Sequence, residues 1–194
     1  MKTSRLEAFS DGVMAIIITI MILEMKAPKG GDFSDLQPLI PKFLSYILSF
    51  IYVGIYWNNH HHLFQAIDRV NGKILWANLT LLFTLSIIPL STAWMGENHF
   101  ERNPLALYGM NLISCAIAFT ILEKMAIAYE GAESKIAKAL HNNTKEYLSL
   151  VLYIAGITAS FFTPLVSLIC YTIVAIIWVI PDSRIEKNLS SLSE

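Results

Sequence analysis

The sequence predicts an all-α membrane protein with six transmembrane helices, and three observations support this fold class. The chain has 194 residues, of which 55% are hydrophobic and 15% are charged, whereas globular domains carry about 25% charged residues. Its apolar stretches approach or exceed the roughly 20 residues that cross a bilayer as a helix. Proline, glycine and asparagine interrupt these stretches so that six helices remain.

The first four predicted spans begin or end at residues that favour helix boundaries. They cover about residues 9–27, 39–64, 72–94 and 104–128. A cluster from Pro28 to Asp32 ends the first span, and Asn71 precedes the third. For the fourth span we expect Asn103 as the N-cap, with Pro104 at the first helical position, where its missing N–H is tolerated.

The apolar stretch 146–180 is too long for a single helix. Pro164 follows two phenylalanines and a threonine, and proline disrupts a helix interior. We therefore expect two short helices over about 146–162 and 164–180, followed by a polar tail at 181–194. The whole chain, 1–194, then forms one transmembrane domain.

An even number of spans places both termini on the same side of the membrane. With six spans, every Lys and Arg falls on the terminal side except Lys26, Lys29, Lys42 and Arg102. Cytoplasmic segments carry an excess of Lys and Arg. We therefore expect a multi-pass integral membrane protein with both termini, and the 181–194 tail, in the cytoplasm.

Polar residues at the mouth of the first span need partners, because lipid offers none. Ser10 and Asp11 lie at this position. In the six-span topology, Arg5, Asn78 and the histidine run 60–62 are near the same side of the membrane. We expect a buried polar network of Arg5, Ser10, Asp11, one of these histidines and Asn78, which fixes the rotation of the first helix.

The histidine run does not predict a metal site. Three consecutive helical residues are separated by 100° each, so at most two of the rings can reach one ion. Neither a metal motif nor a nucleophile–base set accompanies them. A net charge of −1 without a basic face also argues against nucleic-acid binding. We expect no enzyme activity and no cofactor.

A narrow stripe runs along the first span. Gly12, Ile16, Thr19 and Leu23 lie within about 40° of one line on a helix, and Asp11 points about 100° away from it. Such a stripe is either a packing surface or the wall of a path. Periodicity alone favours packing, because threonine often bonds to its own helix.

A sequence motif favours the second interpretation, in which the stripe lines a path. The string Arg5-x-x-x-Phe9-Ser10-Asp11 opens the first span, and Trp57-x-x-His60 closes the second. This pattern resembles the endolysosomal potassium-channel family that lacks the TVGYG filter, in its prokaryotic branch with one six-span unit per chain. Asn78 in the third span and Pro89 near its outer end also fit this resemblance.

The resemblance implies a homotetramer in the prokaryotic cell membrane, with the first helix of each copy around a central pore. Ile16, Thr19 and Leu23 are then pore-lining, with Gly12 on the same stripe. Aliphatic rings form a hydrophobic constriction, and the Thr19 hydroxyls contact partly dehydrated K⁺. The expected partners are further copies of the chain, membrane lipid and monovalent cations, with modest selectivity for K⁺ over Na⁺.

Three other functions compete with a channel. A secondary transporter is disfavoured because the sequence shows neither an inverted repeat nor charged residues in broken midmembrane helices. A membrane enzyme using the histidines lacks catalytic partners. A structural membrane protein would use the polar residues for packing alone.

Overall fold

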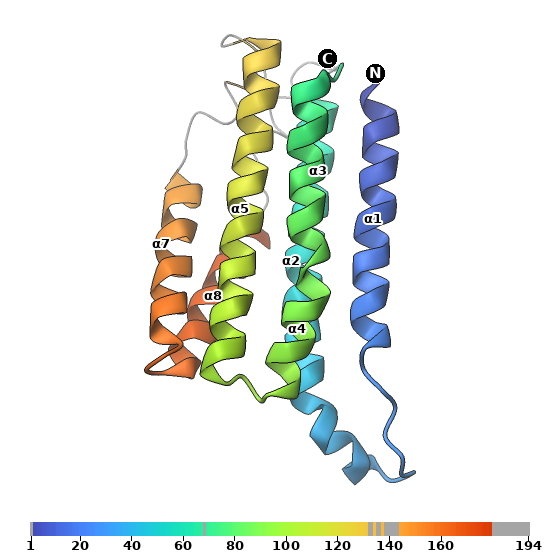
Figure 1. Ribbon diagram of the computed structural model, residues 1–194, viewed down its shortest axis with the longest axis vertical. Helices are drawn as coiled ribbons and strands as arrows, with labels where there is room; N and C mark the ends of the chain where they lie inside the picture. Colours follow the sequence, from blue (N-terminus) through green and yellow to red (C-terminus); the bar gives the residue numbers. More distant parts are fainter. Residues whose placement is uncertain (1, 68, 132–133, 135–136, 138–143, 180–194) are drawn as a thin grey trace, which may run out of the picture.

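The long helices of the computed structural model stand side by side, with α1 at one edge of the bundle (Figure 1). The structure describes residues 2–179 except 68, 132–133, 135–136 and 138–143. Within these ranges no strand is present and four segments are long and apolar enough to cross a membrane. They are α1 (Thr3–Leu23), the 3₁₀ helix η1 (Phe33–Leu39) with α2 (Ile40–Gln65), α3 (Gly72–Ser86) with α4 (Ile88–Glu97), and α5 (Arg102–Glu130).

Two shorter helices form a hairpin beside α5 (Figure 1). Helices α7 (Thr144–Ala159) and α8 (Pro164–Val179) have 16 residues each, about 24 Å of helix at 1.5 Å per residue. Between them, the Thr163 N–H donates to the Ala159 carbonyl at 2.7 Å, and Pro164 starts α8. These helices occupy the regions expected at 146–162 and 164–180, whereas the expected polar tail, 181–194, lies outside the described residues.

Two helix starts differ from the prediction. α1 begins at Thr3 rather than near residue 9, because hydropathy detects only the apolar part of a helix whose first turns are polar. α5 begins at Arg102 with Glu101 as its N-cap, so the assignment of Asn103 as N-cap was wrong. Pro104 is tolerated within the first turn because the N–H that it lacks has no partner inside the helix there.

The third predicted span, 72–94, is broken in the structure. α3 starts with Asn71 as its N-cap, where the Asn71 side chain accepts from the Ile74 N–H at 3.0 Å. It ends at Ser86, and α4 starts at Ile88 with Pro89 in its first turn. Proline cannot donate the backbone hydrogen bond that a continuous helix requires, so the helix restarts there.

Asn111 of α5 binds the backbone at this break. In the amide orientation that satisfies every neighbouring group, its nitrogen donates to the Thr84 carbonyl at 3.0 Å. Its oxygen accepts from the Ile88 N–H at 3.1 Å and faces the Ser91 hydroxyl at 3.2 Å. One buried side chain therefore replaces hydrogen bonds that the broken helix cannot make for itself.

Helix α5 lies between the two halves of the bundle. It packs against α3 and α4 on one side and against α7 and α8 on the other, whereas α1 packs mainly on α2, α3 and α4. Tyr171 of α8 crosses the interior and donates to the Leu105 carbonyl of α5 at 3.2 Å. A Cβ atom at Gly109 would lie 2.1 Å from the Tyr171 hydroxyl, so glycine is required for this close approach.

The contacts of Asn111 predict a stability defect for Asn111→Leu. The variant leaves the Ile88 N–H buried without a partner and removes one of the hydrogen bonds to the Thr84 carbonyl, which keeps its bond from the Ile87 N–H; the expected cost is about 1–3 kcal/mol. For a chain of this length, each kcal/mol corresponds to about 2–4 °C in melting temperature. Thermal unfolding in detergent should therefore show a lower Tm, whereas Ser114→Ala, at an exposed hydroxyl of α5, should leave the Tm near wild type. Equal Tm values for both variants would contradict this role of Asn111.

Candidate pore-lining surface

Helix α1 has two opposite faces. One is buried against the bundle and carries Leu6, Ser10, Met14, Ile17 and Met21, each at most 4% exposed. The other face is open, because no described element of the chain covers it. Successive residues of an α-helix are rotated by about 100° around its axis. Because one set of residues is buried against the bundle, the residues on the opposite side of α1 point away from it.

The predicted stripe lies on the open face. Ile16 is 58% exposed and Leu23 is 77% exposed. Gly12 and Thr19 are exposed as well, and a Cβ atom at Gly12 would meet nothing within 4 Å. The structure therefore places all four residues on one surface of α1, outside the core of the single chain.

Thr19 is the polar member of this surface. Its Oγ1 lies 2.9 Å from the Ile16 carbonyl oxygen and 3.1 Å from that of Ala15. The hydroxyl thus donates its proton to its own helix, as threonine often does. A hydroxyl oxygen has two lone pairs, which remain available on the exposed side.

Three fully buried side chains connect α1, α2 and α3. His60 Nε2 lies 2.8 Å from Asn78 Oδ1, and Asn78 Nδ2 donates to Ser10 Oγ at 3.0 Å. Ser10 in turn donates to the Leu6 carbonyl at 2.9 Å. Every donor in this chain of hydrogen bonds has an acceptor, so it holds Ser10 toward α3.

The same chain of bonds defines the tautomer of His60. Asn78 Oδ1 can only accept, so Nε2 of His60 carries the proton. His60 Nδ1 is buried without a hydrogen-bond partner among the described residues. A proton on this atom would have no acceptor there, so the geometry fits the neutral ring protonated on Nε2.

A second row of contacts joins α1 to α2 nearer the surface. Trp57 Nε1 donates to Asp11 Oδ1 at 3.0 Å, and the Trp57 ring stacks on His61 with centroids 6.2 Å apart. His61 Nδ1 is paired with Glu7, and Gln65 bonds the other ring nitrogen at 2.8 Å. Glu7 and Asp11 are one turn apart on α1, and so are Trp57 and His61 on α2, which gives two matched pairs across antiparallel helices.

The structure does not bring every predicted network residue together. Ser10, Asn78 and His60 form one set of contacts, and Asp11 and Trp57 belong to another. Arg5 and Phe9 are exposed and lie outside both sets. We did not predict Glu7 or its pairing with His61, although the spacing of these residues, four from Asp11 and four from Trp57 on the same helices, was a usable signal.

Within the described ranges, no group of three or more His, Cys, Asp or Glu side chains is arranged to hold a metal ion. Cys115 and Cys170 are free, buried thiols. The main feature of this region is the arrangement of α1. Hydrogen bonds hold one face of this edge helix against the bundle, and the opposite face presents an apolar stripe with the Thr19 hydroxyl.

The fold and this arrangement define a multi-pass integral membrane protein. A sequence model of the family described as endosomal/lysosomal potassium channel TMEM175 matches residues 5–89. A potassium channel of Chryseobacterium sp. (strain P1-3) is 59% identical over 97% of this chain and 98% of the relative. The chain belongs to the TMEM175 family, as its first-span motif indicated, and this is a family of ion channels rather than enzymes.

Other relatives extend the comparison. A potassium channel of Chamaesiphon minutus is 30% identical over 89% of this chain and 91% of the relative. The crystal structure of a lysosomal potassium-selective channel TMEM175 homolog from Chamaesiphon minutus matches with a TM-score of 0.79 at 29% identity, over 93% of this chain and 97% of that chain. The human endosomal/lysosomal proton channel TMEM175 is 25% identical, and the match spans 38% of its length.

The buried hydrogen bonds predict that Asn78→Leu loosens α1. The change removes both bonds of the amide and leaves the His60 Nε2–H without an acceptor, at a cost of about 1–3 kcal/mol. Thermal unfolding should show a lower Tm, and the stripe of α1 should exchange amide hydrogen faster. Thr80→Ala, at an exposed hydroxyl of the same helix that bonds its own backbone, is the control. Wild-type stability of Asn78→Leu would show that these bonds do not hold α1.

Proposed function

We propose that this chain forms a cation channel with modest selectivity for K⁺ over Na⁺, in which four copies surround a pore lined by α1. The observation that carries the proposal is the exposure of Gly12, Ile16, Thr19 and Leu23 on the face of α1 opposite its buried anchor. The potassium-channel names of the bacterial relatives support the choice of ion.

In the proposed constriction, a ring of Thr19 hydroxyls lies between two rings of aliphatic side chains, formed by Ile16 and Leu23. Along a helix, Thr19 is about 4.5 Å beyond Ile16, and Leu23 is about 6 Å beyond Thr19. Narrow rings of such side chains close a pore by excluding water. Between them, four Thr19 oxygens replace part of the hydration shell of a K⁺ ion. K⁺ near Thr19 is then a permeant ion, and the channel needs no cofactor.

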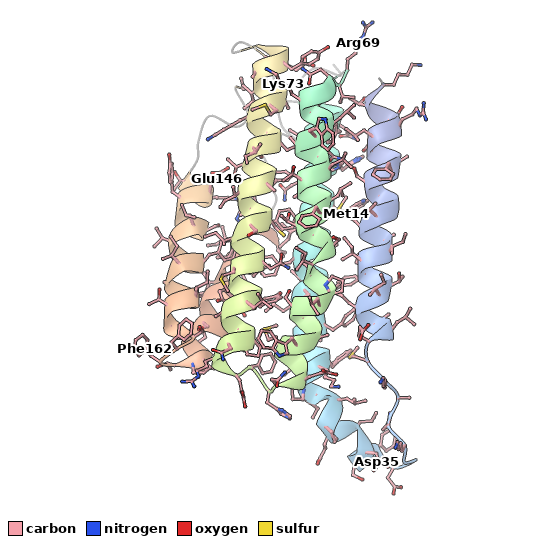
Figure 2. All side chains as sticks on the ribbon, in the orientation of Figure 1. Met14, Asp35, Arg69, Lys73, Glu146 and Phe162 are labelled. Carbon is pink, nitrogen blue, oxygen red and sulfur yellow. The ribbon has the colours of Figure 1, made fainter. Side chains whose placement is uncertain are left out.

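The charge distribution supports an orientation in the cell membrane. Arg69 and Lys73 lie at the end of the bundle where α1 begins, and Asp35 and Phe162 lie at the opposite end (Figure 2). Lys2 and Arg5 belong to the beginning of the chain. Positive residues favour the cytoplasmic side, so this end of the bundle, where the chain begins, faces the cytoplasm.

Recording from the purified protein in planar bilayers tests the proposal. Discrete currents that reverse near the K⁺ equilibrium potential in mixed K⁺ and Na⁺ solutions are the expected result. Slow, saturating flux without discrete openings would indicate a transporter, and folded protein without flux would indicate a structural role. Currents that reverse with an imposed pH gradient would instead indicate the proton conduction named for the animal relatives.

The Thr19 hydroxyl ring predicts the effect of Thr19→Ala on selectivity. Loss of a hydroxyl contact worth about 1 kcal/mol lowers the permeability ratio of K⁺ to Na⁺ by about fivefold. The ratio follows from reversal potentials in mixed solutions, with Thr80→Ala as the matched control outside α1. An unchanged ratio in Thr19→Ala would remove Thr19 from the selectivity mechanism.

The aliphatic rings predict the effect of Ile16→Asn and Leu23→Asn on conductance. An amide side chain wets an apolar constriction, so single-channel current rises severalfold wherever the substituted ring limits the flow. Ile117→Asn places the same change on an exposed face of α5, and we expect its conductance to match wild type. A ring whose substitution leaves the current unchanged does not form the constriction.

A further inference from the structure

A cavity of about 510 Å³ lies on the side of the bundle away from α1. It is bounded by α2, α5 and α7, and Trp178 of α8 closes one part of it. No residue of α1, α3 or α4 lines it, so it is separate from the proposed pore surface. Its size is within the range of pockets that bind small organic molecules, about 300–1,000 Å³.

The wall of the cavity is largely apolar and unusually aromatic. Ile55, Ala116 and Ile117 contribute aliphatic surface. Its aromatic lining consists of Tyr52, Tyr56, Phe119, Tyr147, Tyr153 and Trp178. Aromatic faces attract both flat apolar groups and cations, since the face of the ring is electron-rich.

Charged side chains gather toward one end of this cavity. Glu123 and Lys124 come from the last third of α5, and Glu146 from the first turn of α7. In Figure 2, Glu146 lies nearer the end marked by Lys73 than the end marked by Phe162. Among the described lining residues, two carboxylates therefore accompany one lysine at this end of the cavity.

Glu123 is the carboxylate on the α5 side of this end of the cavity. It is partly buried and forms no salt bridge with any described residue. The other nearby lysine, Lys145, places its Nζ 5.9 Å from the centroid of the Trp178 ring and does not line the cavity. A carboxylate held in a mostly apolar space is stabilised by a cation that enters that space.

We infer that this cavity binds a hydrophobic amine. The protonated nitrogen lies between Glu123 and Glu146, and the apolar body lies among Tyr56, Phe119 and Tyr153. An anion of the same shape is disfavoured beside the two carboxylates, and a neutral molecule forms no ion pair with Glu123. The charge of the head group therefore determines the affinity, whereas the aromatic wall accepts different apolar groups of similar size.

Three probes with one body and different head groups test this inference. They are 4-phenylbutylamine, 4-phenylbutanol and 4-phenylbutyrate, titrated into the full-length protein in neutral detergent by calorimetry, with empty micelles subtracted. We expect the amine to saturate at one molecule per chain and to bind at least tenfold tighter than the alcohol or the acid. Equal affinity for amine and alcohol, or uptake of the amine without saturation, would overturn the inference.

Two variants and a control locate the binding. Glu123→Gln should weaken amine binding at least fivefold and leave alcohol binding unchanged, which also shows that the variant is folded. Ala116→Phe fills the apolar part of the cavity and should abolish binding of both probes. Glu130→Gln lies on an exposed part of the same helix, outside the lining, and should bind like wild type. Retention of amine affinity in both Glu123→Gln and Ala116→Phe would place the amine elsewhere. The measurement does not depend on conduction, so it stands or falls separately from the proposed channel function.

Discussion

The hydrogen bond from Asn78 to Ser10 is the constraint on which the orientation of α1 depends. In lipid, an amide without partners is costly, because no water replaces the missing bonds. Asn78 meets this requirement only when Ser10 turns toward α3. Gly12, Ile16, Thr19 and Leu23 lie roughly opposite Ser10 around the helix. One buried amide therefore determines which residues the molecule presents at its open edge.

The polar side-chain contacts of α1 with other helices are concentrated in its first three turns. Glu7, Ser10 and Asp11 bind side chains of other helices, whereas within the described residues the half beyond Gly12 relies on apolar packing. Its nearest polar approach is the Met21 sulfur, 3.9 Å from the Thr92 hydroxyl. Dispersion contacts between apolar side chains are less directional than hydrogen bonds. The segment that carries Thr19 and Leu23 is thus the less constrained part of the helix, and its other end acts as the fixed point.

Much of the helical architecture could be predicted from the sequence, because long apolar stretches and their breakers are local signals. The break after Ser86 was harder, since Pro89 alone does not say whether a helix ends or restarts. Asn111, which satisfies that break, is 22 residues further along the chain than Pro89, and no local pattern connects the two. Likewise Ser10, Asn78 and a histidine could be proposed as partners, but the pairing of Glu7 with His61 required the register of α1 against α2.

Helix α2 is the element shared by the two surfaces of interest. Trp57, His60 and His61 face α1 and α3, whereas Tyr56 and Asn59 face the cavity beside α5 and α7. An event in the cavity has no direct contact with α1, so it reaches the open edge either from α5 through α3 and α4 or by rotating or shifting α2. Such a motion would strain the bond between His60 and Asn78, whose partners are fully buried and have no alternatives in lipid. The bond that sets the direction of α1 therefore also limits how far the cavity side of the bundle can influence it.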